Sequence, residues 1–132
     1  MLGLLTLLTG MALGSSTLPQ PASVAALGHF RLVLERSDSG FVARCEAGCS
    51  WKELTFRCAA DCRVLIDANG VALDPQAKLA ASPFAFHLQP TLDGWTAESV
   101  TGTAWITLSY GCATFVCRAR VNEFGVSGLG PR

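Results

Sequence analysis

The sequence predicts an all-β fold, an antiparallel sandwich or barrel of about eight short strands arranged as two tandem four-stranded repeats. Three observations lead to this prediction. Short segments alternate apolar and polar residues with a period of two, and turn residues such as Asp and Gly separate them. The chain repeats its own pattern once along its length. Six cysteines occur in closely spaced pairs, which is typical of small domains that disulfides stabilise.

The composition fits a packed domain, since 50% of the residues are hydrophobic and 15% are charged. Ten basic and ten acidic side chains cancel, and no two Lys or Arg residues are adjacent. A nucleic-acid surface needs a basic stripe that displaces counterions, so the sequence predicts no nucleic-acid partner. The same lack of basic runs argues against a polybasic membrane anchor.

The first 25 residues have the outline of a secretory leader. Residues 1–25 contain no charged side chain, and the apolar run over 2–13 is followed by two prolines and several small residues. This order is typical of a signal peptide, with cleavage after Ala25 or Ala26, although no Lys or Arg precedes the run. A buried N-terminal helix is an alternative. Glycines interrupt the run, which argues against a membrane-spanning anchor, and we expect no stable membrane span after leader removal. Residues 26–132 are expected to form a single domain.

Two segments of the chain match each other. The first copy spans residues 30–71 and the second spans 84–126, with an offset of 54 residues that becomes 55 after one insertion between paired cysteines. Self-similarity of this length predicts that each copy is one supersecondary unit, packed against the other. The clearest matches are Phe30 with Phe84, Leu34 with Leu88, Gly40 with Gly94, Gly48 with Gly102, Trp51 with Trp105, Leu54 with Leu108, Cys58 with Cys112, and Cys62 with Cys117.

Each copy is expected to form four strands. These cover residues 30–35, 41–45, 51–57 and 62–67, then 84–89, 95–99, 105–110 and 117–122. The connector over 72–83 predicts a short helix with Asp74 as its N-cap, and the tail after Val126 is expected to fray. The side chains expected in the core are Phe30, Leu32, Leu34, Leu54, Phe56, Phe84, Phe86, Leu88, Leu108 and Tyr110.

Comparison of the two copies indicates how the cysteines pair. The first copy has two cysteine pairs. Its first pair, Cys45 and Cys49, is replaced in the second copy by Ser99 and Thr103, whereas both cysteines of its second pair are kept. Loss and retention by pairs predict three local disulfides, Cys45–Cys49, Cys58–Cys62 and Cys112–Cys117. A four-thiolate zinc site from the first four cysteines is an alternative that the spacing permits. Redox catalysis is disfavoured because no C-x-x-C motif occurs.

Few side chains suggest chemistry. The only histidines are His29 and His87, and the expectation for both is a partly exposed position without a catalytic role. Glu53 and Asp61 are a weak candidate for a carboxylate pair, and the run from Asp67 to Gly70 is better explained by a turn than by a calcium loop. The sequence therefore predicts no cofactor and no catalytic or metal-binding residue.

The shared side chains that are best suited to recognition are Trp51, Trp105, Arg63 and Arg118. Tryptophans on an outer sheet face stack on sugars or bind peptides, so these four residues are the candidate binding surface. The preferred interpretation for the tryptophans is nevertheless packing inside the domain, because both copies keep them.

The run from Gly48 to Phe56, followed by Ile66 to Val71, resembles a G-C-x-W-K-x-L-x-F signature of small exported, mostly uncharacterised bacterial proteins. The resemblance implies export and a compact β fold, and it carries no activity. The expected function is a non-catalytic binding or structural role in the periplasm or outside the cell, with a protein or a glycan as partner. Two alternatives stay open, an inhibitor or immunity-type partner of another exported protein, and a small secreted enzyme.

Overall fold

The structure, a computed structural model, describes residues 27–59, 61–74, 81–112 and 117–130. In these residues the chain forms ten strands and no helix, which confirms the all-β prediction. The leader and the expected connector helix lie outside the described residues. The strands are β1 (Arg31–Arg36), β2 (Gly40–Ala47), β3 (Glu53–Arg57), β4 (Val64–Asp67), β5 (Gly70–Ala72), β6 (Ala85–Pro90), β7 (Gly94–Thr101), β8 (Thr107–Gly111), β9 (Cys117–Asn122) and β10 (Gly125–Leu129).

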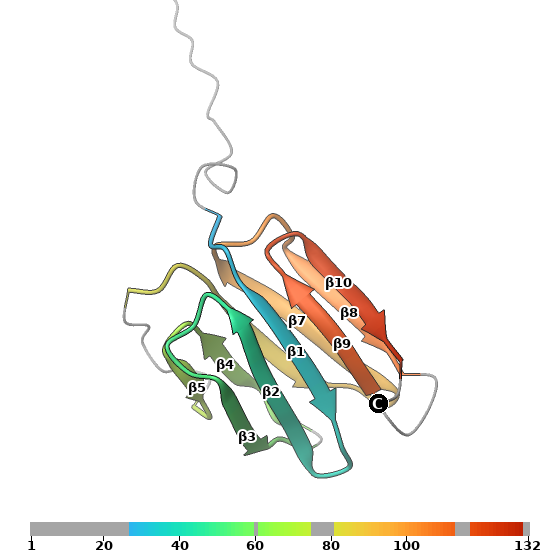
Figure 1. The fold of residues 1–132 in the computed structure, drawn as a ribbon. Helices are drawn as coiled ribbons and strands as arrows, with labels where there is room; N and C mark the ends of the chain where they lie inside the picture. Colours follow the sequence, from blue (N-terminus) through green and yellow to red (C-terminus); the bar gives the residue numbers. More distant parts are fainter. Residues whose placement is uncertain (1–26, 60, 75–80, 113–116, 131–132) are drawn as a thin grey trace, which may run out of the picture.

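The strands form two antiparallel five-stranded sheets that pack face to face (Figure 1). The first sheet, called sheet A, has the order β10-β9-β1-β2-β3, and the second, sheet B, has the order β5-β4-β6-β7-β8. The end strands of each sheet pair with one neighbour only, so neither sheet closes. The fold is therefore an open sandwich, and the barrel that the sequence left as an alternative is wrong.

Strands from both parts of the chain are mixed in each sheet. We call residues 27–74 the first half and residues 81–130 the second half. The first three strands of each half form most of one sheet, and the last two strands of that half join the other sheet. As a result β9 pairs with β1 in sheet A, and β4 pairs with β6 in sheet B. Because each half completes the sheet of the other, the two halves bury one shared core.

The structure contains ten strands where the sequence predicted about eight. The two additional strands, β5 and β10, follow tight turns in which a side-chain oxygen binds the backbone. Asp67 Oδ1 accepts hydrogen bonds from the N–H groups of Asn69 and Gly70, at 2.7 and 3.0 Å. Asn122 Oδ1 accepts the equivalent bonds from residues 124 and 125, at 2.8 and 3.0 Å. Each turn reverses the chain into a further strand, so the tail over 127–129 pairs with β9 and does not fray as expected.

The core lies between the sheets, and its centre is aromatic. Phe30 and Phe84 stack with their ring centroids 4.0 Å apart, and Phe86 meets the indole of Trp105 edge-on at 5.7 Å. Most of the expected core residues are buried. The exceptions are Leu54, Leu108 and Tyr110, which are half-buried on the edge strands β3 and β8. Buried residues that the sequence analysis did not single out include Phe41, Ala43, Val64, Ile66, Trp95, Ala97, Ala119 and Val121.

Candidate functional site

The two tryptophans of the candidate binding surface join a loop to a turn at one end of the sandwich. Trp51 Nε1 donates a hydrogen bond to the Asp67 carbonyl oxygen at 3.0 Å, and Trp105 Nε1 donates to the Asn122 carbonyl oxygen at 2.9 Å. Trp105 is 9% exposed, and Trp51 is half-buried and packed against the core. Each tryptophan precedes its edge strand, so the strand alternation does not set its direction. The buried indole of Trp105 offers no face for stacking on a ligand.

The two arginines of the candidate surface lie on opposite sheets. Arg63 Nη2 pairs with Glu98 Oε1 at 2.5 Å on the outer face of sheet B. Arg118 lies in β9 of sheet A, where its Nε is 3.4 Å from Glu35 Oε2 and its Nη1 donates to the Gly130 carbonyl oxygen at 2.8 Å. The structure thus brings none of the four residues together into one binding surface.

His87 lies beside the Arg63–Glu98 pair in an open depression of about 280 Å³. Burial lowers the pKa of His87 below its ordinary value, the charge of Arg63 lowers it further, and Glu98 partly offsets both. Its Nδ1 atom is buried without a hydrogen-bond partner in the described part of the chain. The imidazole is therefore held neutral near neutral pH, as expected for a partly exposed strand histidine.

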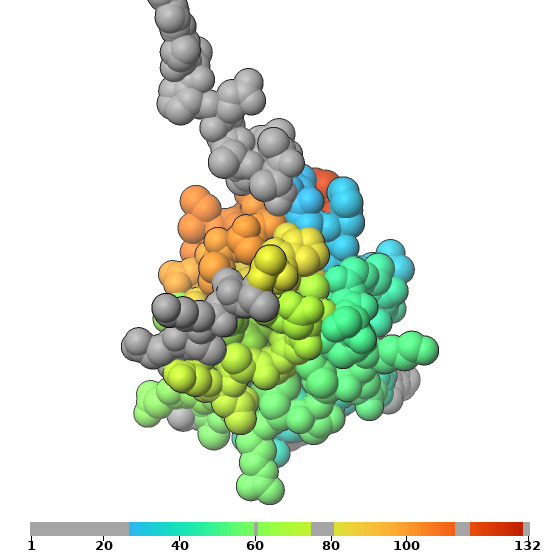
Figure 2. All heavy atoms as spheres, turned by 90° about the vertical axis from the view of Figure 1, so that its left-hand side faces the viewer, coloured from blue at the N-terminus to red at the C-terminus, as the bar shows by residue number. Residues whose placement is uncertain are grey.

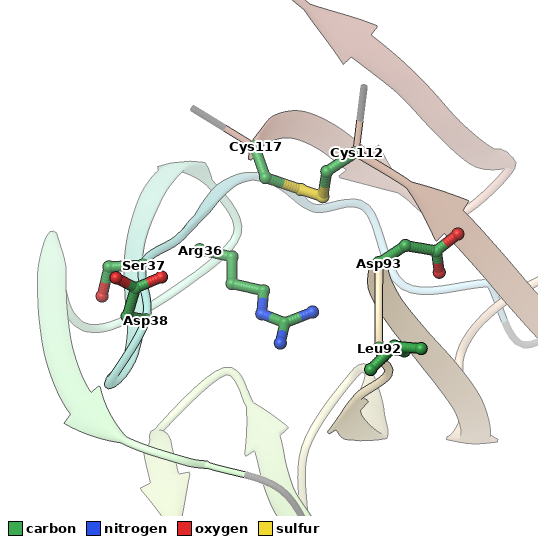
Figure 3. A pocket seen from close by; sticks show the side chains of 7 residues that line it. All are labelled: Arg36, Ser37, Asp38, Leu92, Asp93, Cys112 and Cys117. Atoms are coloured by element: carbon green, nitrogen blue, oxygen red, sulfur yellow. A yellow bond between two sulfur atoms is a disulfide. The ribbon is translucent and has the colours of Figure 1, made fainter. Parts of the chain in front are cut away.

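A second depression lies at the end of the sandwich opposite to the one that carries the tryptophans (Figure 3). Figure 3 shows the Arg36 guanidinium at its centre, with Ser37 and Asp38 on one side and Leu92 and Asp93 on the other. Arg36 Nη1 donates to the carbonyl oxygens of Thr91, at 2.6 Å, and of Gly94. These bonds tie β1 to the β6–β7 turn, so this arginine has a structural role.

The cysteines form the three predicted disulfides, Cys45–Cys49, Cys58–Cys62 and Cys112–Cys117. The zinc alternative therefore does not hold, since its four sulfurs are bonded in pairs. Across the described ranges, no group of three His, Cys, Asp or Glu residues is placed to hold a metal ion. In the second half, hydroxyls replace the first disulfide, and the Ser99 and Thr103 oxygens lie 2.5 Å apart in a hydrogen bond.

This replacement leads to a stability prediction. The disulfide at positions 45 and 49 closes a loop so short that its removal by C45A/C49A should cost about 2 kcal/mol of unfolding free energy. The variant C45S/C49T should lose about 1 kcal/mol less, because it installs the hydroxyl pair that the second half uses at the equivalent loop. Urea unfolding of both variants measures the difference, and equal losses would show that the hydroxyl pair does not substitute for the bond.

A group of exposed apolar side chains lies at the end of the sandwich that carries the tryptophans. We call Val100, Ile106 and Phe124 the apolar end, and they are 45%, 81% and 67% exposed. Backbone hydrogen bonds of 2.8 Å join the segments that carry them, from Ser99 N–H to the Ile106 carbonyl oxygen and from Ala104 N–H to that of residue 123. The β7–β8 loop that carries Ile106 packs on residues 81–84 beside it (Figure 2).

The first half is polar at all three equivalent positions. Val100 aligns with Glu46, Ile106 with Lys52, and Phe124 with Asn69. The backbone of the two halves is alike here, since residues 46 and 100 both fall at a register shift and residues 69 and 124 both follow the turn-forming side chain. The same local backbone therefore forms in the first half with polar side chains at these positions.

One buried carboxylate lies next to the apolar end. Glu123 Oε2 is 2.9 Å from His29 Nδ1, and its Oε1 accepts a hydrogen bond from the Phe30 N–H. Burial raises the pKa of Glu123, but the hydrogen bonds from His29 and from backbone N–H groups outweigh that effect, so its pKa lies below the ordinary value. The carboxylate stays charged at neutral pH and fixes the start of β1 against the β9–β10 turn.

The outer face of sheet A is covered by ion pairs. Glu46 Oε1 binds the Nε atoms of Arg31 and Arg120 at 3.0 and 2.8 Å, and Arg44 Nε is 2.6 Å from Glu53 Oε1. Exposed pairs of this kind contribute little to stability, but they leave this face hydrophilic. The apolar end is thus the candidate site that remains. Sequence comparison focused on positions that the copies share, whereas this site is visible only at positions where they differ.

Comparison with known proteins adds no assignment, because no family model, no curated protein and no solved structure matches the chain. Among the described residues, the structure contains no helix with the length and apolar character needed to cross a membrane.

Proposed function

We propose that the protein is an exported, non-catalytic β domain that binds another exported protein through its apolar end. The observation that carries the proposal is the exposure of Val100, Ile106 and Phe124 at positions where the first half has charged or polar residues. Exposed apolar patches are characteristic of protein-binding sites, and backbone hydrogen bonds bring the segments that carry these three side chains together at one end. Phe124 is the natural anchor, because aromatic side chains contribute most to binding energy.

Two features support export. The sequence predicts a signal peptide over 1–25, and the three disulfides are of the kind that form in oxidising compartments. Disulfides this local also suit a domain that must stay folded outside the cell. A binding role is favoured over catalysis because the depressions beside His29 and His87 are shallow and open to solvent, whereas acid–base chemistry needs polar groups converging in a cleft.

The inhibitor alternative is a special case of the same proposal, in which the bound protein is an enzyme. An inhibitor would present a protruding loop, and the loops closed by Cys45–Cys49 and by Cys112–Cys117 are the candidates. Residues 113–116 lie outside the described part of the chain, so the second of these loops plays no part in the proposal. The first loop contains Glu46, which pairs with Arg31 and Arg120 on the hydrophilic side of the same end.

The test compares binding by the oxidised wild type and by V100E/I106K/F124N, which carries the first half's residues at the apolar end. We expect the wild type to capture a specific partner from exported proteins, and the triple variant to bind it at least about 100-fold more weakly. The matched control is L92D, which removes a fully exposed apolar side chain at the opposite end, where the first half has Asp38. Undiminished binding by the folded triple variant would contradict the proposal.

A further inference from the structure

The two halves also differ in how they protect their edge strands. The strand β3 at the edge of sheet A carries Glu53 and Arg57 and follows Lys52, whereas its counterpart β8 at the edge of sheet B has the sequence Thr-Leu-Ser-Tyr-Gly. Charged side chains on an edge strand prevent it from pairing with another chain. The edge at β3 is thus protected, and the edge at β8 is not.

Within the residues that the structure describes, neither edge strand on the side of the sandwich that contains β8 carries a charged side chain. The edge strand of sheet A on this side is β10, with the sequence Gly-Val-Ser-Gly-Leu. Tyr110 of β8 reaches across the gap between the sheets, because its hydroxyl donates to the Arg118 carbonyl oxygen at 3.3 Å and lies against Gly128. The two edge strands therefore form one continuous surface, which we call the β8/β10 side.

The hydrogen-bond pattern shows which backbone groups of β8 face outward. The N–H of Ser99 binds the carbonyl oxygen of Ile106, and the N–H of Cys112 binds that of Asp93. Because bonding residues alternate along an antiparallel pair, the even-numbered residues 106–112 bond to β7. Thr107, Ser109 and Gly111 then direct their N–H and C=O groups to the open edge, and all three are exposed.

Packing within the domain does not require β8 to lack charged side chains. At Gly111, whose counterpart is Arg57, an added Cβ would meet no atom within 4 Å. Ser109 and Thr107 are likewise exposed, with room for longer side chains. Since β3 carries charges at two of the three equivalent positions, Glu53 and Arg57, their absence from β8 is not explained by the domain's own structure.

We propose that the β8/β10 side is a dimer interface, at which β8 pairs antiparallel with β8 of a second copy. A two-fold axis perpendicular to the sheets would place β10 opposite its own copy as well, so both sheets would continue across the interface. A two-fold interface must complement itself, and an edge without charges brings no like charges together. A side two strands thick is a small interface, at or below about 1,200 Å² in total, so the dimer is weak and forms at high concentration.

The test is sedimentation velocity of the oxidised protein expressed from the full chain, from about 1 µM to about 1 mM. We expect a monomer–dimer equilibrium that S109P weakens at least tenfold, because proline removes an outward N–H without breaking a bond to β7. The matched control is T55P at the equivalent position of β3, which should leave the dimer intact.

Several results would overturn the proposal. These are a wild type that stays monomeric over the whole range, a dimer that survives S109P, and a dimer that T55P weakens equally. If S109P does not fold, the variant T107E/G111E decides, because it places like charges on both copies of the edge. Loss of the dimer in V100E/I106K/F124N but not in the β8 variants would assign the interface to the apolar end instead. The binding test of the apolar end uses other residues, so either proposal can fail alone.

Discussion

Replacing Phe84 by alanine should lower the free energy of unfolding by about 3–5 kcal/mol. Phe84 is fully buried at the point where the two halves meet, and its ring stacks on Phe30 at 4.0 Å and lies 6.3 Å from Phe86. The loss combines the transfer of an aromatic ring to water with the cavity left between the sheets. Because a domain of this size has a total stability of roughly 5–15 kcal/mol, the variant should be close to unfolding at ambient temperature. Urea unfolding followed by tryptophan fluorescence measures the change.

The control for this prediction is L92A, which truncates a fully exposed side chain. Its unfolding free energy should stay within about 0.5 kcal/mol of the wild type. A Phe84 variant that loses no more stability than L92A would show that the ring stack does not hold the two sheets together.

The second large effect is expected at Gly102. This residue has a φ of +84°, which side chains disfavour, and a Cβ there would lie 2.1 Å from the Pro83 carbonyl oxygen and 2.8 Å from the Phe84 Cα. The variant G102A would therefore strain the backbone and push the β7–β8 loop away from the start of β6. We expect a loss of about 3 kcal/mol or more, measured as a shift of the urea midpoint.

The matched control is G111A, at a glycine without a positive φ and without a neighbour for the added Cβ. This change should be close to neutral, because alanine also restricts the unfolded chain. Similar losses for G102A and G111A would mean that the tight contact between the loop and β6 is not a determinant of stability. Weak binding by G102A at the apolar end would not be informative, since the same loop carries Ile106.

Much of the fold follows from local patterns in the sequence. Alternation places Leu32 and Leu34 of β1 and Phe86 and Leu88 of β6 in the core, and all four are buried. The disulfides could be paired from the sequence because Cys45 and Cys49 align with Ser99 and Thr103, whereas Cys58 and Cys62 align with Cys112 and Cys117. These predictions need only the order of residues within each strand and an alignment of the two halves of the sequence.

The features that the sequence did not predict depend on contacts between distant segments. Alternation gives each strand a buried face but does not say which sheet it joins, so the crossing of β4 and β9 to the opposite sheets was not foreseen. The strands β5 and β10 contain glycine and few apolar residues, so they carry no strand pattern of their own. Trp105 is buried through a hydrogen bond to a turn 17 residues later, which no local pattern encodes.

The most direct test of the account is amide hydrogen exchange of the protein, free and bound to its captured partner. We predict slower exchange on binding over residues 99–106 and 121–125, which carry the apolar end. The equivalent segments of the first half, residues 45–52 and 67–70, are the internal control and should exchange as in the free protein. Slower exchange in these control segments, or around the turns at 37–40 and 91–94, without protection of the apolar end would contradict the account.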